Sequence, residues 1–177
     1  FPAGRNAELL LAEFEADGDG MEYEVPEPLK LVKSIKPIAW IFDAPQPTGS
    51  VYHEGAVLLT VKYREVTGYY VPYIWGDNDE LMLLNREVYG WPQLSCDHDA
   101  LHKDESSVWG IITRRGETLI KLSVFLERTA KPKELPLRED WLQVRKFPNP
   151  IRGKPSIRHL IHTVVPPGTV HELWTGR

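Results

Sequence analysis

Three polar residues of this chain have side chains suited to chemistry on a carbonyl compound. Glu54 directly precedes a stretch with the alternation of a strand, and Arg86 and Gln93 stand on either side of a Gly–Trp–Pro turn. A carboxyl group buried beside a sheet rich in tyrosine and tryptophan has a raised pKa and can act as a general acid or base. Gln93 offers a donor and an acceptor to a carbonyl or hydroxyl, and Arg86 can bind a carboxylate with two parallel hydrogen bonds. We therefore take these three residues as candidate catalytic residues.

Aromatic and apolar residues near these positions are candidates for the wall of a substrate cavity. A small-molecule site is usually an apolar pocket with a few convergent polar groups. The candidate substrate-binding residues are Tyr52, His53, Tyr73, Trp75, Trp91 and Leu94. A purely structural role stays open for the aromatic ones, because such residues also fill cores. It stays open equally for Glu54 as a surface residue at the start of a strand, and for Gln93 as a turn amide.

The remaining reactive side chains do not have the spacing of a known site. His53, Cys96 and His98 lack the intervals of zinc ligands, and a nucleophilic Cys–His pair has no better support. The Asp-Gly-Asp-Gly sequence at residues 17–20 lacks the further acids and the closing glutamate of a calcium loop, and is typical of a turn. We therefore predict neither a metal site nor a cofactor.

The composition is that of an ordinary globular domain. The chain has 177 residues, of which 26% are charged and 42% hydrophobic, and its formal net charge is -4. One domain with a sizeable core is expected at this length, and the charge gives no reason to predict binding to nucleic acid or to an anionic membrane. One cysteine excludes an internal disulfide framework. Because no stretch has the pattern of a signal peptide or a bilayer-spanning segment, we expect a cytoplasmic protein.

Fifteen prolines and thirteen glycines predict many short elements joined by turns. Alternating or apolar stretches predict strands at residues 35–42, 56–63, 68–75, 107–113, 118–126, 157–165 and 169–174. Residues 8–15 are typical of a strand or a short helix, the apolar run 81–84 of a strand leading to the turn at Gly90, and the proline-rich segment 130–158 of irregular structure. The prediction is a mostly β (α+β) fold with few short helices, whose antiparallel sheets close into a barrel or cone around an internal cavity.

Four segments resemble motifs of the acetoacetate decarboxylase family. They are Val-Pro-Glu-Pro-Leu at 25–29, Tyr-His-Glu at 52–54, Asn-Arg-Glu-Val-Tyr-Gly-Trp-Pro at 85–92 and Val-His-Glu-Leu-Trp-Thr-Gly at 170–176. The first three fall at the family's spacing, with Asn85 in place of a family glycine. The resemblance covers nearly the whole chain. It implies a single domain over residues 1–177, with a closing strand and helix expected after Arg177, and assembly into homo-oligomers.

The resemblance also implies that the family's usual chemistry is lost. In the family, two lysines follow the aromatic–proline corner; the first forms a Schiff base with the keto substrate, and the charge of the second lowers the pKa of the first. Gln93 and Leu94 stand at those positions, and an amide cannot form an imine. A family arginine and a family glutamate fall on Ala7 and Ala39. Of the family's polar set, Glu54 is retained.

We therefore expect an enzyme that acts on a small-molecule carbonyl substrate by acid–base chemistry: dehydration, hydration, isomerisation or cyclisation. Glu54 would move the proton, while Gln93, with Arg86, would polarise the carbonyl. Two alternatives stay open. One is a Schiff-base decarboxylase or aldolase with a relocated lysine, for which Lys62 and Lys121 lie in predicted strands. The other is a non-catalytic small-molecule-binding protein that keeps the cavity.

Overall fold

The computed structural model describes residues 6–97, 100–147, 149–151, 156–165 and 168–177, without the side chains of residues 18 and 19. Within these residues strands predominate and the helices are few and short, as predicted. The strands are β1 (Glu8–Glu13), β2 (Lys30–Leu31), β3 (Ile38–Pro45), β4 (Val51–Tyr63), β5 (Val66–Gly76), β6 (Leu94–Ser95), β7 (His102–Lys103), β8 (Ser107–Arg114), β9 (Glu117–Thr129), β10 (Asp140–Phe147), β11 (Ile157–Val164) and β12 (Trp174–Gly176). The helical segments are α1 (Gly18–Glu24), α2 (Asp79–Leu84), the π-helical turn η1 (Asn85–Tyr89) and the 3-10 turn η2 (Pro132–Glu134).

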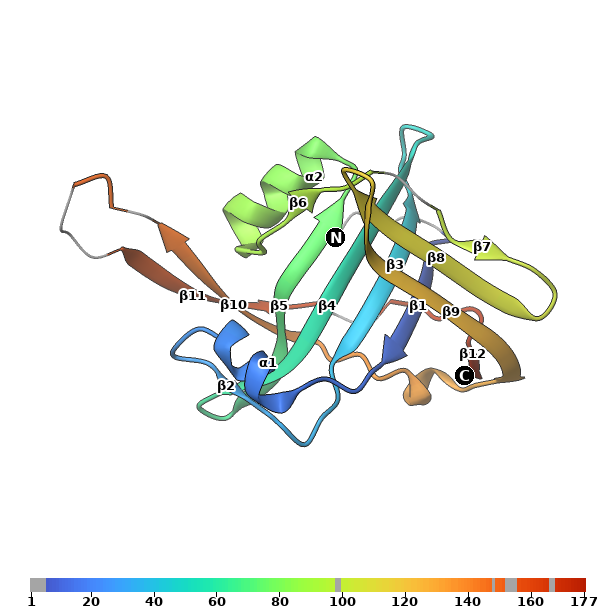
Figure 1. Ribbon diagram of the computed structural model, residues 1–177, viewed down its shortest axis with the longest axis horizontal. Coiled ribbons are helices and arrows are strands. Elements are labelled where there is room, and N and C mark those ends of the chain that lie inside the picture. Colours follow the sequence, from blue (N-terminus) through green and yellow to red (C-terminus); the bar gives the residue numbers. More distant parts are fainter. Residues whose placement is uncertain (1–5, 98–99, 148, 152–155, 166–167) are drawn as a thin grey trace.

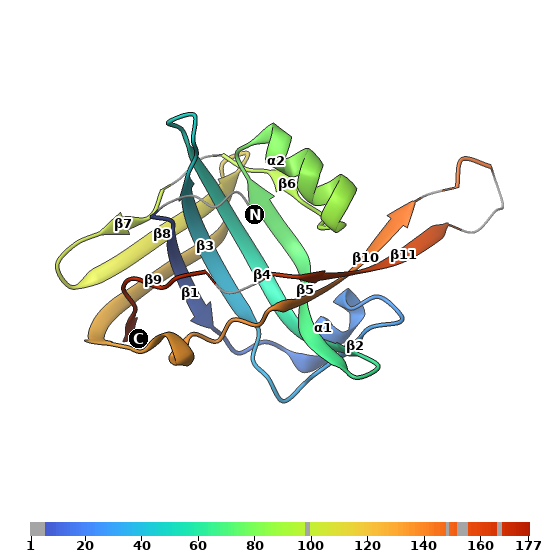
Figure 2. The ribbon, with the colours of Figure 1, turned by 180° about the vertical axis from the view of Figure 1, so that it is seen from behind.

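The strands form two sheets. The larger runs in the order β1-β3-β4-β5-β10-β11, with β2 added to β4 and β6 added to β5. Neighbours pair antiparallel from β1 to β5, and the β10–β11 hairpin joins in parallel, with Trp141 opposite Tyr69. The smaller sheet runs β12-β9-β8-β7, and its β8–β9 hairpin crosses one face of β1 and β3 (Figure 1; from behind in Figure 2). Neither order closes on itself over the described residues, so the barrel or cone stays a prediction.

β4 lies at the centre of the larger sheet and is buried on both faces. The main core on one face holds Ile38, Trp40, Ala56, Leu58, Tyr69, Val71, Ile74, Trp91 and Trp141. On the other face Val57 packs against Ile41 of β3 and Ile112 of β8. Because successive side chains of a strand alternate, Glu54 faces the side of the main core and His53 faces the smaller sheet. Burial of each large apolar side chain contributes about 1.5–3 kcal/mol, which holds β4 in this register.

Two segments that the sequence analysis assigns to a turn and to a strand are helices. Residues 17–20 were expected to form a turn, but α1 begins at Gly18, and its Met21 packs against a core cluster around Leu29. Residues 81–84 were expected to form a strand, but they belong to α2, which Asn78 caps by accepting a hydrogen bond from the Leu81 amide at 2.9 Å. An apolar run of four residues does not distinguish a strand from a helix, and the capping residue decides here.

The strand predictions for β3, β4, β5, β8, β9 and β11 are confirmed, and residues 8–13 form a strand. The segment 130–158 is not irregular throughout, because β10 lies within it and buries Trp141 and Leu142. The predicted strand at 169–174 is wrong except at Trp174, where β12 begins. The Pro-Pro-Gly sequence at residues 166–168 predicts a turn between the strands predicted at 157–165 and 169–174, but residues 166 and 167 lie outside the described residues. In the ranges given above, no helix has both the length and the apolar character needed to cross a membrane.

Candidate active site

A tight corner follows β5 and places several side chains against the sheet. α2 passes directly into η1, a π-helical turn of a kind that often marks functional sites. The turn ends at Gly90, whose φ of 72° lies in the left-handed region, and a Cβ there would come within 2.9 Å of Ile161. The amide of Trp91 then donates to the Asn85 carbonyl at 2.9 Å, and the Trp91 ring packs in the main core. The corner therefore points Asn85 inward and directs the chain back towards β5.

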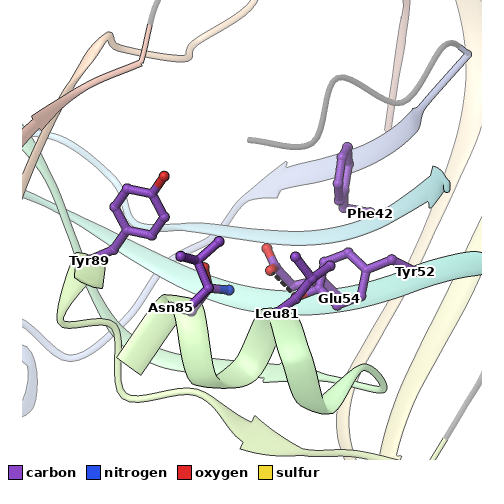
Figure 3. Close-up of a pocket in the computed structure, with 7 residues that line it drawn as sticks. Phe42, Tyr52, Glu54, Leu81, Asn85 and Tyr89 are labelled. Carbon is purple, nitrogen blue, oxygen red and sulfur yellow. Dashed lines mark hydrogen bonds between the residues drawn. The ribbon is translucent and has the colours of Figure 1, made fainter. Parts of the chain in front are cut away.

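A small cavity lies between this corner and the sheet, as Figure 3 shows. Its lining comes from β3, β4, α2 and η1 and consists of Phe42, Tyr52, Glu54, Leu81, Leu84, Asn85 and Tyr89. The centre of a water molecule can occupy about 20 Å³ of it, which is room for an ordered water but not for a substrate. Glu54 and Asn85 are buried, whereas Leu84 is 38% exposed. A substrate must therefore displace part of the wall, of which Leu84 on α2 is the most exposed residue.

Glu54 is the buried carboxyl group of the cavity, with 1% of its surface exposed. Its Oε2 accepts a hydrogen bond of 2.5 Å from the Tyr52 hydroxyl. Burial raises the pKa of Glu54 to about 7, while the Tyr52 hydroxyl and the nearby Trp40 indole lower that pKa. Within the described residues, neither Glu54 Oε1 nor the Trp40 Nε1 has a hydrogen-bond partner of acceptable geometry. A buried carboxyl group that titrates near neutral pH and keeps one oxygen free is suited to proton transfer.

A chain of hydrogen bonds runs behind the cavity to Glu54. The Asn85 Nδ2 donates to the Gln93 Oε1, and the Gln93 Nε2 donates to the Tyr52 hydroxyl at 2.8 Å. Gln93 is completely buried and is not part of the cavity lining. Gly76 makes room for it, because a Cβ there would overlap the Gln93 amide and lie 2.8 Å from the Tyr52 oxygen. Both ends of the Gln93 amide are therefore bonded to protein in this structure, and its action on a substrate carbonyl stays a prediction.

Arg86 also lies elsewhere than predicted. Its side chain is exposed, and its Nη1 donates to the backbone carbonyl of Gln93 at 3.0 Å, outside the cavity lining. The adjacent Glu87 forms an ion pair with Arg145. Because this segment is helical, Arg86 and Glu87 are both exposed while Asn85 is buried. Arg86 therefore supports the corner, and its binding of a substrate carboxylate stays a prediction.

Of the six candidate substrate-binding residues, Tyr52 alone lines the cavity. His53 projects from the opposite face of β4, where its Nδ1 lies 2.8 Å from the Asp43 Oδ1. Tyr73 and Trp75 stack on each other, with ring centroids 6.0 Å apart, on the face of β5 turned away from Gly76 and the cavity. Trp91 is a core residue that stacks on Tyr89, and Leu94 is 38% exposed on β6. The placements of His53, Tyr73 and Trp75 follow from the alternation of side chains along β4 and β5.

Most residues of the cavity wall were not among the candidate site residues predicted from the sequence. Leu81, Leu84 and Asn85 stand at i, i+3 and i+4, the spacing of one helix face, and Tyr89 is four residues further on. That periodicity could have identified them if residues 81–84 had been taken as a helix. Phe42 could be placed only with the sheet register, in which it lies opposite Glu54 on β4.

The other reactive groups do not join this site. Cys96 is half-buried, and burial is the main reason why its pKa is raised to about 11, so the thiol is not activated. His98 lies outside the described residues. Every lysine that the structure describes is exposed, including Lys62 and Lys121. The described ranges contain no group of three or more His, Cys, Asp or Glu side chains that could hold a metal ion, and metal binding stays untested.

Comparison with known proteins identifies the family. The family model described as acetoacetate decarboxylase (ADC) matches residues 1–177. The chain belongs to the acetoacetate decarboxylase family. It is 29% identical to the acetoacetate decarboxylase of Clostridium beijerinckii, over 99% of this chain and 74% of that protein. The prediction of the family from four short motifs is confirmed.

Solved structures of acetoacetate decarboxylase-like proteins share the fold. The acetoacetate decarboxylase of Legionella pneumophila has a TM-score of 0.86 and 21% identity, over 98% of this chain and 70% of that one. The enduracididine biosynthesis enzyme MppR, in complex with the condensation product of pyruvate and imidazole 4-carboxaldehyde, has a TM-score of 0.77 and 16% identity, over 96% of this chain and 72% of that one. The family consists of enzymes that act on small carbonyl compounds. Self-association stays a prediction.

Proposed function

We propose that this acetoacetate decarboxylase family member transfers a proton on a small carbonyl compound by general acid–base catalysis, with Glu54 as the catalytic residue. The observation that carries the proposal is a buried carboxyl group with a pKa of about 7 in the wall of the cavity. A base is most effective when its pKa lies near the working pH, because it is then largely ionised and still binds a proton well. No lysine among the described residues lines the cavity, so the proposed chemistry uses no imine.

The cavity offers complementary groups for such a transfer. The ionised Glu54 takes a proton from the carbon next to the carbonyl; the C–H bond breaks, an O–H bond forms, and the electron pair moves to the carbonyl oxygen. Asn85 stabilises this oxygen, because its amide nitrogen has a second hydrogen besides the one donated to Gln93. The proton on Glu54 then returns to another carbon, which is an isomerisation, or to a departing hydroxyl group, which is a dehydration. MppR, with its condensation product of pyruvate and an aldehyde, supports a range of carbonyl reactions on this fold.

The test is proton exchange at carbon, because it requires the first step alone. Small ketones and aldehydes are incubated with the protein in D₂O, and loss of the hydrogens next to the carbonyl is followed by NMR. We expect catalysed exchange whose rate rises with pH through about 7 and levels off above it, because ionised Glu54 is the active form. A protein that binds these ketones but exchanges none of their hydrogens would be the binding protein of the alternative hypothesis.

Borohydride trapping tests the lysine alternative directly. We expect no covalent adduct by mass spectrometry when the protein is incubated with pyruvate or acetoacetate and then reduced, because every described lysine is exposed and lies outside the cavity lining. A family member with the lysine pair at its aromatic–proline corner serves as the positive control. An adduct on this chain, located by peptide mapping, would restore Schiff-base chemistry with a relocated lysine.

A further inference from the structure

The hydrogen-bond chain behind the cavity runs in one direction only. The Asn85 amide nitrogen donates to the Gln93 oxygen, so the nitrogen of the Gln93 amide is the atom that faces Tyr52. An amide nitrogen cannot accept a hydrogen bond, and therefore the Tyr52 oxygen must accept from Gln93. A hydroxyl group has a single hydrogen, which Tyr52 gives to the Glu54 Oε2 at 2.5 Å. Each bond fixes the direction of the next.

The residues of this hydrogen-bond chain are almost completely shielded from bulk solvent. The exposed fractions of the four residues are 7% for Asn85, 0% for Gln93, 3% for Tyr52 and 1% for Glu54. In such an environment hydrogen bonds strengthen one another, and an unpaired group is costly. The Gln93 amide and the Tyr52 hydroxyl pack closely against Gly76, which holds both groups in contact with each other. The Asn85 amide nitrogen is the donor at the far end of this hydrogen-bond chain.

We propose that Asn85 and Gln93 are positioning residues that fix the direction of this chain, so that Tyr52 donates only to Glu54 and Oε1 is the oxygen of Glu54 left to exchange a proton with substrate. The proposal deepens the function proposed above and rests on it for the role of Oε1. It also assigns a purpose to Gln93 at the position where the family resemblance places a lysine: a lysine ammonium has no acceptor and could not take the bond from Asn85.

Replacement of Asn85 by aspartate is expected to reverse the direction of the hydrogen bonds that Asn85 and Gln93 make. Aspartate has almost the same shape, but when ionised it only accepts hydrogen bonds. The Gln93 amide must then turn its nitrogen towards residue 85 and its oxygen towards Tyr52. The Tyr52 hydrogen goes to that oxygen, and Glu54 loses its donor. Since the Tyr52 hydrogen bond lowers the pKa of Glu54, its loss raises this pKa.

Other ionisable groups lie near Glu54, and their effect on its pKa must be separated from that of reversing the hydrogen bonds. Tyr52 and Tyr89 line the same cavity, and Cys96 beyond β6 is affected by the charge of Glu54. Burial raises the pKa of Tyr52 far above its usual value, with Glu54 and Asp77 adding to the rise, so Tyr52 does not titrate near neutral pH. A new aspartate at position 85 would itself raise the pKa of Glu54 by charge repulsion. A single variant therefore does not distinguish reversal of the hydrogen bonds from repulsion by the new charge, but a double-mutant cycle does.

The experiment measures the pKa of Glu54 by carboxyl ¹³C NMR in four proteins: wild type, Tyr52→Phe, Asn85→Asp and the double variant, with Glu54→Gln identifying the signal. We expect Tyr52→Phe to raise this pKa in the wild-type background and to leave it unchanged in the Asn85→Asp background, where Tyr52 no longer bonds to Glu54. Asn78→Asp is the matched control, because it makes the same chemical change at the start of α2, away from the hydrogen bonds that lead to Glu54. In that background the full Tyr52→Phe shift must persist. Equal Tyr52→Phe shifts with Asn85 and with Asp at this position would overturn the proposal.

Gln93→Met provides a second cycle if Asn85→Asp does not fold. Methionine fills the same space without hydrogen bonds, so Tyr52 loses its fixed orientation and the pKa of Glu54 rises by part of the Tyr52→Phe shift. Tyr52→Phe in that background adds the remainder; a full, undiminished shift would contradict the proposal. The NMR titration measures the pKa of Glu54 in the absence of substrate, whereas ketone exchange measures catalysis. If the two substitutions act non-additively on the pKa of Glu54 but the protein catalyses no exchange of ketone hydrogens, the proposed function alone is refuted. If they act additively and Glu54-dependent exchange is observed, the positioning role alone is refuted.

Discussion

Glu54→Gln is expected to reduce ketone hydrogen exchange by about 10²–10⁴-fold, the usual contribution of a general base. The amide keeps the size of the side chain and can still accept the Tyr52 hydrogen bond, so the cavity is preserved while the group that takes the proton is lost. The rate of exchange by wild type and variant is measured by NMR at about pH 8, where the carboxyl group is ionised. Binding of the ketone should change much less than the rate.

Glu65→Gln is the matched control for this variant. Glu65 is exposed in the turn between β4 and β5, so the same chemical change is made at the other end of the strand that carries Glu54. Its exchange rate should equal that of the wild type. If Glu54→Gln exchanged the ketone hydrogens as fast as Glu65→Gln, Glu54 would not be the base, whatever its pKa.

The stability of the protein should depend on pH through Glu54. The pKa of this carboxyl group is raised from about 4.5 in the unfolded chain to about 7 in the folded protein. Between these values the folded state binds a proton that the unfolded state has lost, so the free energy of unfolding falls as pH rises. The contribution is fully present below about pH 4.5 and is lost as pH passes through about 7. At about 1.4 kcal/mol per pH unit, the fall amounts to roughly 3 kcal/mol.

Urea unfolding of wild type and Glu54→Gln at several pH values isolates this contribution. Other groups titrate in both proteins, but the difference between the two free energies of unfolding depends on residue 54 alone. We expect the advantage of the wild type over the variant to shrink by roughly 3 kcal/mol from about pH 4.5 to about pH 7.5 and then to stay constant. Parallel curves would show that the pKa of Glu54 is not raised by folding. A difference that grew with pH would show that it is lowered.

Much of the fold could be predicted from local patterns. The alternation in residues 56–63 and 68–75 indicated β4 and β5, and the stretches 107–113 and 118–126 indicated β8 and β9. The failures occurred where local patterns were ambiguous. The run 81–84 suits a strand or a helix equally, and the capping bond from the Asn78 side chain decides between them. β10 was not predicted because its segment is rich in proline. Its stability comes from burial of Trp141 against other elements.

The candidate site, like the fold, could be predicted from the sequence only in part. Glu54 could be identified because it belongs to a Tyr-His-Glu segment that resembles a family motif, and it lines the cavity. The roles predicted for Gln93 and Arg86 stay predictions, and both residues lie outside the cavity lining. The type of a side chain does not reveal which atoms its polar groups meet. Gln93 bonds to Asn85 and Tyr52, and Arg86 bonds to a backbone carbonyl.

The order of residues along the chain was enough to identify the family and the absence of a lysine from position 93. It was also enough to show that a carboxyl group is retained at position 54. The raised pKa of this carboxyl group, about 7, could not be predicted in this way, because desolvation requires neighbours from β3, α2 and η1. The direction of the hydrogen-bond chain was likewise a tertiary result, since Gln93 meets Tyr52 across 41 residues of sequence.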